Sequence, residues 1–197
     1  MFRYALSIAA ATAALVAVAP AAQAHAHGSH HDAAKVAPYS PITLAEVEAA
    51  QQAWGNALVA ISTEYDNKGF AAAKKLAETV LDTAYGYNMG PVLFKPTLTL
   101  APQTFRTTRD GALAYFVGGN PEYKNDKGFA LNGWRSYKVQ NAGVVITGNS
   151  AISMGNVMLT NSKGEVTTVD KTWGWVRDGE GKLRIVLHHS SLPYTAK

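Results

Sequence analysis

The chain has 197 residues, no cysteine, 47% hydrophobic residues and a formal net charge of +4. Without cysteine, neither a disulfide nor a thiolate metal site can hold the fold together, so a hydrophobic core must stabilise it. The basic residues are scattered, which argues against nucleic acid as a partner and leaves a small polar or anionic ligand open.

Residues 1–24 have the pattern of a secretory signal peptide. Arg3 gives a positive start, an apolar run follows, and Ala22-Gln23-Ala24 offers the small residues of a cleavage site. This run is too short and too rich in alanine for a membrane-spanning helix, and no later stretch approaches the roughly 20 apolar residues that a bilayer requires. We therefore expect an exported, periplasmic protein with no membrane segment.

Residues 25–42 contain four of the six histidines and have the composition of a disordered tail. After cleavage the new amino terminus is His25-Ala26-His27, which could bind copper or nickel, and His30 and His31 could add affinity for zinc. The simpler interpretation is a solvated tail with no role in metal binding. The folded domain is expected to cover residues 43–197.

Two helices are predicted at the start of this domain. Thr43 and Glu46 form a capping box, and apolar residues then recur every three or four positions as far as Tyr65. The stretch 66–69 interrupts this pattern, and a second amphipathic helix begins at Phe70 and ends near Ala84.

From residue 91 onward the apolar period falls to two, which predicts strands. The expected strands are 92–98, 112–117, 135–140, 144–147, 151–160, 166–177 and 183–191. Turn sequences at 161–164 and 178–181 make the last three an antiparallel meander. Helices followed by such a sheet indicate an α+β fold with helices on one face. Glycines inside or beside the strands could curve the sheet into a cone with a pocket; they are Gly148, Gly155 and Gly174.

The last strand ends in four polar residues, within the sequence LRIVLHHSSLPY. Because side chains alternate along a strand, His188 and Ser190 share one face and His189 and Ser191 share the other. One pair can line a pocket, but the alternation does not say which. A polar surface at a strand end is the simpler alternative.

Three other polar residues interrupt apolar runs: Thr97, Tyr115 and Asn156. Each has a structural explanation, since Thr and Tyr favour strands and Asn can satisfy a bulge. A catalytic zinc site needs three protein ligands, and the two adjacent histidines of the last strand point to opposite faces. We therefore expect no metal in the core.

Several segments together resemble the iota-class carbonic anhydrases, a family built on the association domain of calcium/calmodulin-dependent kinase II. The segments are EYDNKG (64–69), VLFKPT (92–97), ALAYFVGGN (112–120), KGFAL with Trp134, NAGVVITGNSAISMGN (141–156) and LRIVLHHSSLPY (183–194). The resemblance extends from about residue 42 to residue 194, and its most specific parts are the FKPT and HHSS stretches.

The resemblance implies a nuclear-transport-factor-2-like cone with N-terminal helices on a curved antiparallel sheet, commonly dimeric, that interconverts carbon dioxide and bicarbonate. It implies a catalytic pocket lined by Thr97, Tyr115, His188 and Ser190, which selects the even-numbered face of the last strand. Members of the family are described as metal-free or as dependent on zinc or manganese, and the poor supply of core ligands favours the metal-free type here.

In the mechanism that we expect from this resemblance, the three hydroxyls hold a water and His188 takes its proton directly or through the network. Carbon dioxide would rest on apolar rings, and one amide is a further candidate for binding; these residues are Phe94, Phe116, Trp173 and Asn156. The alternative function is a non-catalytic exported oligomerisation or small-ligand-binding module of the same fold.

Overall fold

The computed structural model describes residues 39–196. The predicted signal peptide and most of the histidine-rich tail lie outside the described residues. The elements are helices α1 (Leu44–Lys68), α2 (Phe70–Ala84) and α3 (Arg109–Val117), short 3₁₀ turns Pro121–Tyr123 and Phe129–Leu131, and strands β1 (Leu93–Lys95), β2 (Trp134–Thr147), β3 (Ser150–Asn161), β4 (Val166–Arg177) and β5 (Leu183–Ser191).

The first two helices form where the sequence predicts them. The Thr43 hydroxyl accepts a hydrogen bond from the Glu46 amide, and the Glu46 carboxylate accepts one from the Thr43 amide, so the capping box begins α1. Gly69 separates α1 from α2 with a φ of 80°, a conformation that favours glycine. The two helices therefore follow each other without a longer loop.

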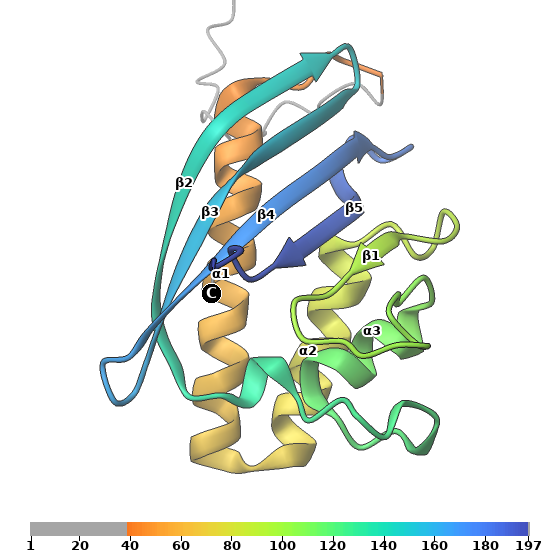
Figure 1. The fold of residues 1–197 in the computed structure, drawn as a ribbon. Helices are drawn as coiled ribbons and strands as arrows, with labels where there is room; N and C mark the ends of the chain where they lie inside the picture. The colour runs from red at the N-terminus through yellow and green to blue at the C-terminus, as the bar shows by residue number, and fades with distance from the viewer. Residues whose placement is uncertain (1–38, 197) are drawn as a thin grey trace, which may run out of the picture. The chain divides into compact units, whose positions relative to one another are not determined.

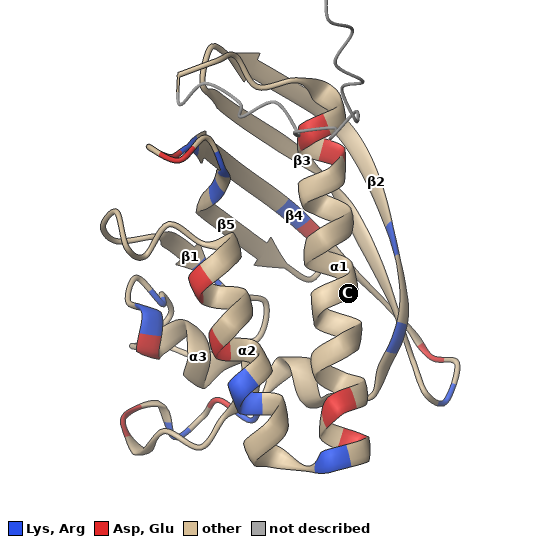
Figure 2. Ribbon diagram, turned by 180° about the vertical axis from the view of Figure 1, so that it is seen from behind, with Lys and Arg blue, Asp and Glu red and all other residues tan. Residues whose placement is uncertain are grey.

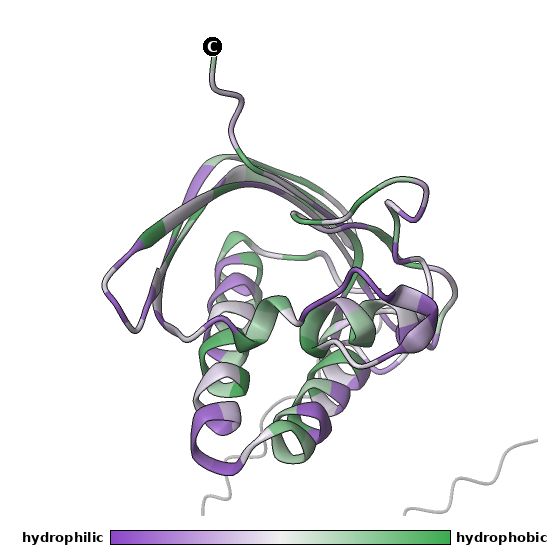
Figure 3. Ribbon diagram, turned by 60° about the horizontal axis from the view of Figure 1, so that its bottom comes forward, coloured by the Kyte–Doolittle hydropathy of each residue, from purple (hydrophilic) through white to green (hydrophobic). Residues whose placement is uncertain are grey.

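The strands form one sheet in the order β1-β5-β4-β3-β2. Strands β2 to β5 are an antiparallel meander, whereas β1 pairs in parallel with β5, so the sheet is mixed and not purely antiparallel as predicted. The sheet bends over the helices and presents its concave face to them (Figures 1 and 3). The predicted α+β architecture, with N-terminal helices on one face of a curved sheet, is confirmed.

One bend in the sheet depends on a glycine. The register between β2 and β3 shifts between Asn141 and Gly143, opposite Gly155. A Cβ atom on Gly155 would lie 2.1 Å from the carbonyl oxygen of Gln140, which is closer than any packed atom pair allows. The backbone of β2 therefore approaches β3 here because residue 155 has no side chain. A second shift lies at Gly174 in β4.

The core fills the space between the concave face and the helices and is unusually aromatic. Its largest buried apolar residues include Trp54, Tyr85, Phe94, Phe116, Trp173 and Trp175. Charged residues gather on helix surfaces, strand ends and loops, and few interrupt the sheet (Figure 2). Within residues 39–196, no helix is both long and apolar enough to cross a bilayer.

The residues just before α1 already pack against the sheet. Ile42 is buried, and its amide donates to the Gly148 carbonyl over 2.8 Å. The buried Arg177 guanidinium donates to the carbonyls of Ser40 and Pro41. The residues at the end of the predicted tail thus contact the sheet.

Three strand predictions need correction. Residues 112–117 are not a strand but most of helix α3, which the Thr108 side chain caps and which ends at Gly118. The predicted strands 135–140 and 144–147 are one strand, β2, which continues through the bulge at Asn141. Strand β1 covers only part of 92–98, because Pro96 has no amide hydrogen to extend the pairing.

Candidate active site

The inner face of β5 carries two buried polar side chains, His188 and Ser190, each about 1% exposed. Across the strand pair, Ser190 lies opposite Lys171 and His188 lies opposite Trp173. The Thr97 hydroxyl, just beyond β1, donates to the Ser190 hydroxyl over 2.6 Å. The even-numbered face of the strand is therefore the inner one, and it brings Thr97 and Ser190 into contact.

Tyr115 reaches the same region from α3. Its side chain is 5% exposed, and its hydroxyl has no hydrogen-bond partner among the described residues. It lies beside a cavity of about 120 Å³ whose lining includes Leu98, Asp126, Phe129 and Asn132. A buried hydroxyl without a partner is costly, so this one is suited to a ligand of a few atoms in the cavity.

The pKa of the Tyr115 phenol reflects its burial. Burial raises the pKa well above its ordinary value of 10, and this is the largest effect. This increase in the pKa is partly opposed by the Thr97 hydroxyl and by the backbone at Thr97 and Leu98. None of these groups has the geometry of a hydrogen bond to the phenol oxygen. Tyr115 is therefore protonated at neutral pH and can act as a hydrogen-bond donor.

Both ring nitrogens of His188 are engaged by protein groups. Nδ1 lies 2.9 Å from the Tyr85 hydroxyl, and Nε2 lies 2.6 Å from the Lys171 ammonium nitrogen, Nζ. Tyr85 in turn accepts a hydrogen bond from the Trp54 indole over 3.0 Å. Burial, and then the charge of Lys171, lower the pKa of His188 well below 6.5. His188 therefore has no free nitrogen to offer to the cavity.

Aromatic rings pack tightly against this network. The ring of Phe94 stacks on His188 with centroids 4.5 Å apart, and Phe116 stacks on Phe94 at 5.7 Å. Trp173 lies 5.9 Å from His188, and the ring of Tyr115 meets Phe94 edge-on. Two of the three aromatic residues predicted to bind substrate, Phe94 and Trp173, thus contact His188, and Phe94 and Phe116 both contact Tyr115.

Asn156 does not join them. It lies on the outer face of β3, where its amide donates to the Asp170 carboxylate over 2.8 Å. Its neighbour in the alternation, Met154, is 61% exposed on the same face. The inner position beside Asn156 belongs to Gly155, which has no side chain.

Two residues that hydrogen-bond to His188 are not predicted from the sequence: Lys171 and Tyr85. Lys171 alternates with Trp173 and Trp175 along β4, and that alternation is the only signal that it faces the core. A lysine among apolar positions is ordinarily expected to be exposed. Tyr85 ends α2, where it looks like a helix-terminating residue.

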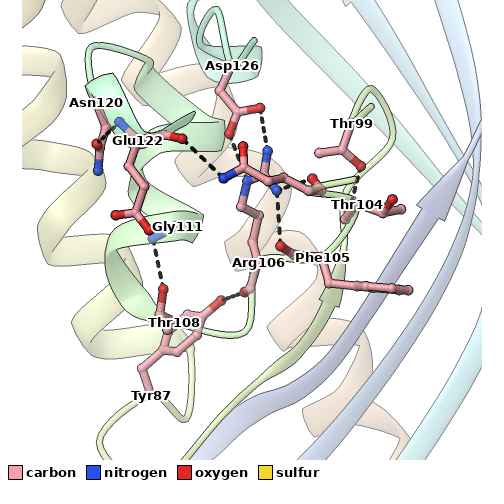
Figure 4. A network of polar contacts seen from close by, with 11 residues as sticks. Tyr87, Thr99, Thr104, Phe105, Arg106, Thr108, Gly111, Asn120, Glu122 and Asp126 are labelled. Carbon is pink, nitrogen blue, oxygen red and sulfur yellow. Dashed lines mark hydrogen bonds and ion pairs between the residues drawn. The ribbon is translucent and has the colours of Figure 1, made fainter. Parts of the chain in front are cut away.

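A buried ion pair supports the cavity wall. The Arg106 guanidinium donates to both carboxylate oxygens of Asp126 over 2.8 Å, and also to the carbonyl of Phe105 (Figure 4). Tyr87 donates to the Arg106 carbonyl, and the ring of Tyr123 lies 4.6 Å from the guanidinium carbon. These contacts tie the segment after β1 to the segment after α3, which together border the cavity.

Residues 39–196 contain no group of three or more histidine, cysteine, aspartate or glutamate side chains arranged to hold a metal ion. The polar side chains that line the cavity are the Tyr115 phenol, the amides of Asn125 and Asn132, and the charged groups of Asp126 and Lys127. This set can hold and polarise a small oxygen-containing molecule by hydrogen bonds.

Comparison with known proteins gives consistent matches. Residues 45–192 match the family model of metal-independent carbonic anhydrases. A metal-independent carbonic anhydrase of Nostoc sp. (strain PCC 7120) is 64% identical over 153 residues, covering 78% of this chain and 75% of the relative. The crystal structure of a cyanobacterial iota-carbonic anhydrase complexed with bicarbonate is 61% identical, with a TM-score of 0.79 over 82% of this chain and 97% of the other.

A more distant structure shares the fold. A protein of Xanthomonas campestris, described as a calcium/calmodulin-dependent protein kinase II association domain, is 20% identical, with a TM-score of 0.51 over 80% of this chain and 96% of the other.

Proposed function

The chain belongs to the metal-independent carbonic anhydrases, and we propose that it hydrates carbon dioxide reversibly to bicarbonate beside Thr97, Tyr115 and Ser190. The observation that carries this assignment of the site is the Tyr115 hydroxyl, which is buried beside a small cavity and has no hydrogen-bond partner within residues 39–196. The hydrogen-bonded Thr97 and Ser190 hydroxyls supply the other polar groups. The core needs no cofactor.

The hydroxyls have complementary tasks in the hydration step. Thr97 donates to Ser190, so its own oxygen remains able to accept a hydrogen from the attacking water. Tyr115 and Ser190 can donate to the oxygen on which negative charge develops as water attacks the carbon. Carbon dioxide is apolar and would pack against the rings that contact Tyr115, those of Phe94 and Phe116.

His188 acts indirectly in this mechanism. Since Lys171 and Tyr85 occupy its nitrogens, it cannot take a proton from the water without first giving up one of these bonds. The water's proton can instead pass to Thr97 as the Thr97 proton moves to Ser190 and the Ser190 proton moves to the developing oxyanion. This relay forms carbonic acid, which gives bicarbonate when it releases a proton to solvent. Assistance by general bases is typically worth about 10² to 10⁴ in rate, whereas zinc-bound hydroxide supports turnover near 10⁶ s⁻¹ in another class of carbonic anhydrase. We expect a slower enzyme.

Hydration activity should survive exhaustive dialysis against a chelator. The expected change is less than about twofold, because the groups around the cavity act by hydrogen bonding and not as Lewis acids. The measurement is stopped-flow carbon dioxide hydration before and after dialysis, with metal content determined on the same samples. A loss of activity that added zinc or manganese restores would contradict the metal-free mechanism, and no activity in either sample would contradict the function.

We also propose that the protein is exported and periplasmic, on the basis of the pattern of residues 1–24. The mature protein would then begin at His25, and its histidines could bind copper, nickel or zinc apart from the catalytic domain. The mass of the protein recovered from the periplasmic fraction would decide the cleavage site. Retention of the full-length chain in the cytoplasm would contradict export.

A homodimer is proposed from the outer face of the sheet. An apolar row crosses the five strands in register, formed by Val145, Ile152, Gly174, Leu187 and Leu93. Val145, Ile152 and Leu93 are each more than half exposed, which is costly for a surface facing water. Ile152→Lys should convert a dimer to a monomer in light scattering at micromolar concentration; a wild-type monomer would contradict the proposal.

A further inference from the structure

Lys171 is the most unusual residue of the core. It is 3% exposed and projects from the inner face of β4, and its only resolved pKa effect is burial, with no carboxylate offsetting it. Nζ lies 4.4 Å from the centre of a ring of Trp54, 5.6 Å from that of Trp173 and 2.6 Å from His188 Nε2. A permanently charged ammonium at this depth would be expensive without an anion.

The hydrogens of the network decide how Lys171 bonds to His188. The Trp54 indole can only donate, so Tyr85 accepts from it and must place its own hydrogen elsewhere. His188 Nδ1 is the acceptor at 2.9 Å. The single hydrogen of a neutral His188 then resides on Nε2 and points at Lys171, which can accept it only as a free amine.

The alternative arrangement leaves a group unsatisfied. If Lys171 were an ammonium, it would donate to Nε2, and the hydrogen of His188 would move to Nδ1 and point at Tyr85. Tyr85 would then accept two hydrogens, and its own would have no acceptor among the hydrogen bonds of the described residues. Burial raises the pKa of Tyr85 well above 10, so losing that hydrogen is no remedy.

We propose that Lys171 is a free amine in the resting protein and is a positioning residue, which fixes His188 in the Nε2-protonated tautomer by accepting its hydrogen bond. The effect of Lys171 on catalysis rests on the proposed function. The protonation states of Lys171 and His188 are inferred from the hydrogen-bond network alone. Lys171 thereby has a task although it contacts neither the cavity nor the reacting atoms.

The fixed imidazole supports the site through two contacts. His188 stacks flat on Phe94, and the edge-on contact of Phe94 with Tyr115 is 5.7 Å between centroids. His188 also shares the inner face of β5 with Ser190, which pairs with Lys171 across the sheet. Protonation of Lys171 would reverse the tautomer, remove the acceptor of Tyr85 and place a charge beside these rings.

Few titratable groups face Lys171. His188 faces it from β5, and the phenols of Tyr85 and Tyr115, both neutral, belong to the same core. Helix α1 presents the uncharged ring of Trp54 to Lys171. The charged groups nearby in sequence, Asp170, Lys95 and His189, project from the outer face of the sheet. A drop in activity on acidification can therefore be assigned to Lys171 with little interference.

The direction of the pH effect follows from the lowered pKa. Lys171 is a free amine above its pKa in the folded protein, which lies below the ordinary 10.5, and becomes an ammonium as the pH falls through it. Activity should thus be full on the alkaline side and decline on acidification.

The test combines nitrogen NMR of the full chain with steady-state kinetics. At pH 8, the ¹⁵N shift of Lys171 Nζ, assigned by its loss in Lys171→Met, should be that of a free amine, and His188 should carry its hydrogen on Nε2. Lys171→Met should lower kcat for hydration about 10 to 100-fold, as replacement of residues that orient a functional histidine does at metal sites, and should abolish the decline on acidification.

Lys138→Met is the matched control, because Lys138 is exposed on β2 and should leave both readouts unchanged. An ammonium signal for Lys171 at pH 8, an Nδ1-protonated His188, or an unaltered pH profile in Lys171→Met would overturn the proposal. If Lys171→Met fails to fold and Lys171 Nζ cannot be assigned in this way, the tautomer of His188 in the wild-type spectra still decides the proposal. Failure of hydration by the wild type would instead count against the proposed function, since the spectra need no activity.

Discussion

Tyr115→Phe should reduce kcat for carbon dioxide hydration by about 10² to 10³ while leaving the fold unchanged. The reduction follows from removing a donor aimed at developing negative charge, which is commonly worth that factor. Stability should be unchanged or slightly higher, because the lost hydroxyl has no partner among the described residues and is costly to bury. Stopped-flow hydration assays and thermal unfolding of the same preparation measure both effects.

Two companion variants make this result specific. Ser190→Ala should also lose most activity, but with some loss of stability, because the Thr97 hydroxyl loses its acceptor. Tyr65→Phe, on the exposed side of α1, is the matched control and should behave as wild type. Near-normal rates in both Tyr115→Phe and Ser190→Ala would exclude these hydroxyls from the reaction.

Asp126→Ala should lower the free energy of unfolding by about 3 to 5 kcal/mol. Its carboxylate and the Arg106 guanidinium are both almost completely buried, so removing the acid leaves an uncompensated charge in the protein. For a domain of this size the unfolding temperature should fall by roughly 6 to 20 °C. Urea unfolding followed by tryptophan fluorescence measures the change.

Asp110→Ala is the control for this loss. Asp110 Oδ1 lies 3.9 Å from Arg109 Nη1, and the Asp110 side chain is 81% exposed. Its removal should therefore change the free energy of unfolding by less than about 0.5 kcal/mol. If the two variants were equally stable, the Arg106–Asp126 pair would have no special role in holding the cavity wall.

The fold was predictable wherever one periodicity dominates. Strands 166–177 and 183–191 have the predicted bounds because alternation and glycine turns agree there. Residues 112–117 were misassigned because a short apolar run buried on several sides has no distinct period, and the decisive signal was the Thr108 cap. The parallel pairing of β1 depends on distant contacts that no local pattern contains.

The site was predictable only in part. Alternation paired His188 with Ser190, but the choice of the inner face, and the roles of Thr97 and Tyr115, came from the family resemblance. Lys171 was missed because its alternation with Trp173 and Trp175 was its only signal, and composition rules place lysine at the surface. Asn156 lies on the outer face because Ser153, Gly155 and Val157 take the inner positions of β3 by simple alternation, so its predicted role in binding substrate stays a prediction that the described contacts do not support.

The position of β5 within the sheet has a consequence for the assembly of the molecule. This strand enters between β4 and β1, although it is the last one along the chain. Helices α1 and α2 are neighbours in the sequence and can pack together early. Strand β1 can pair only with β5, and the paired residues are about a hundred positions apart in the sequence. The hydroxyls of Thr97 and Ser190 can therefore form their hydrogen bond only after β5 has joined the sheet beside β1.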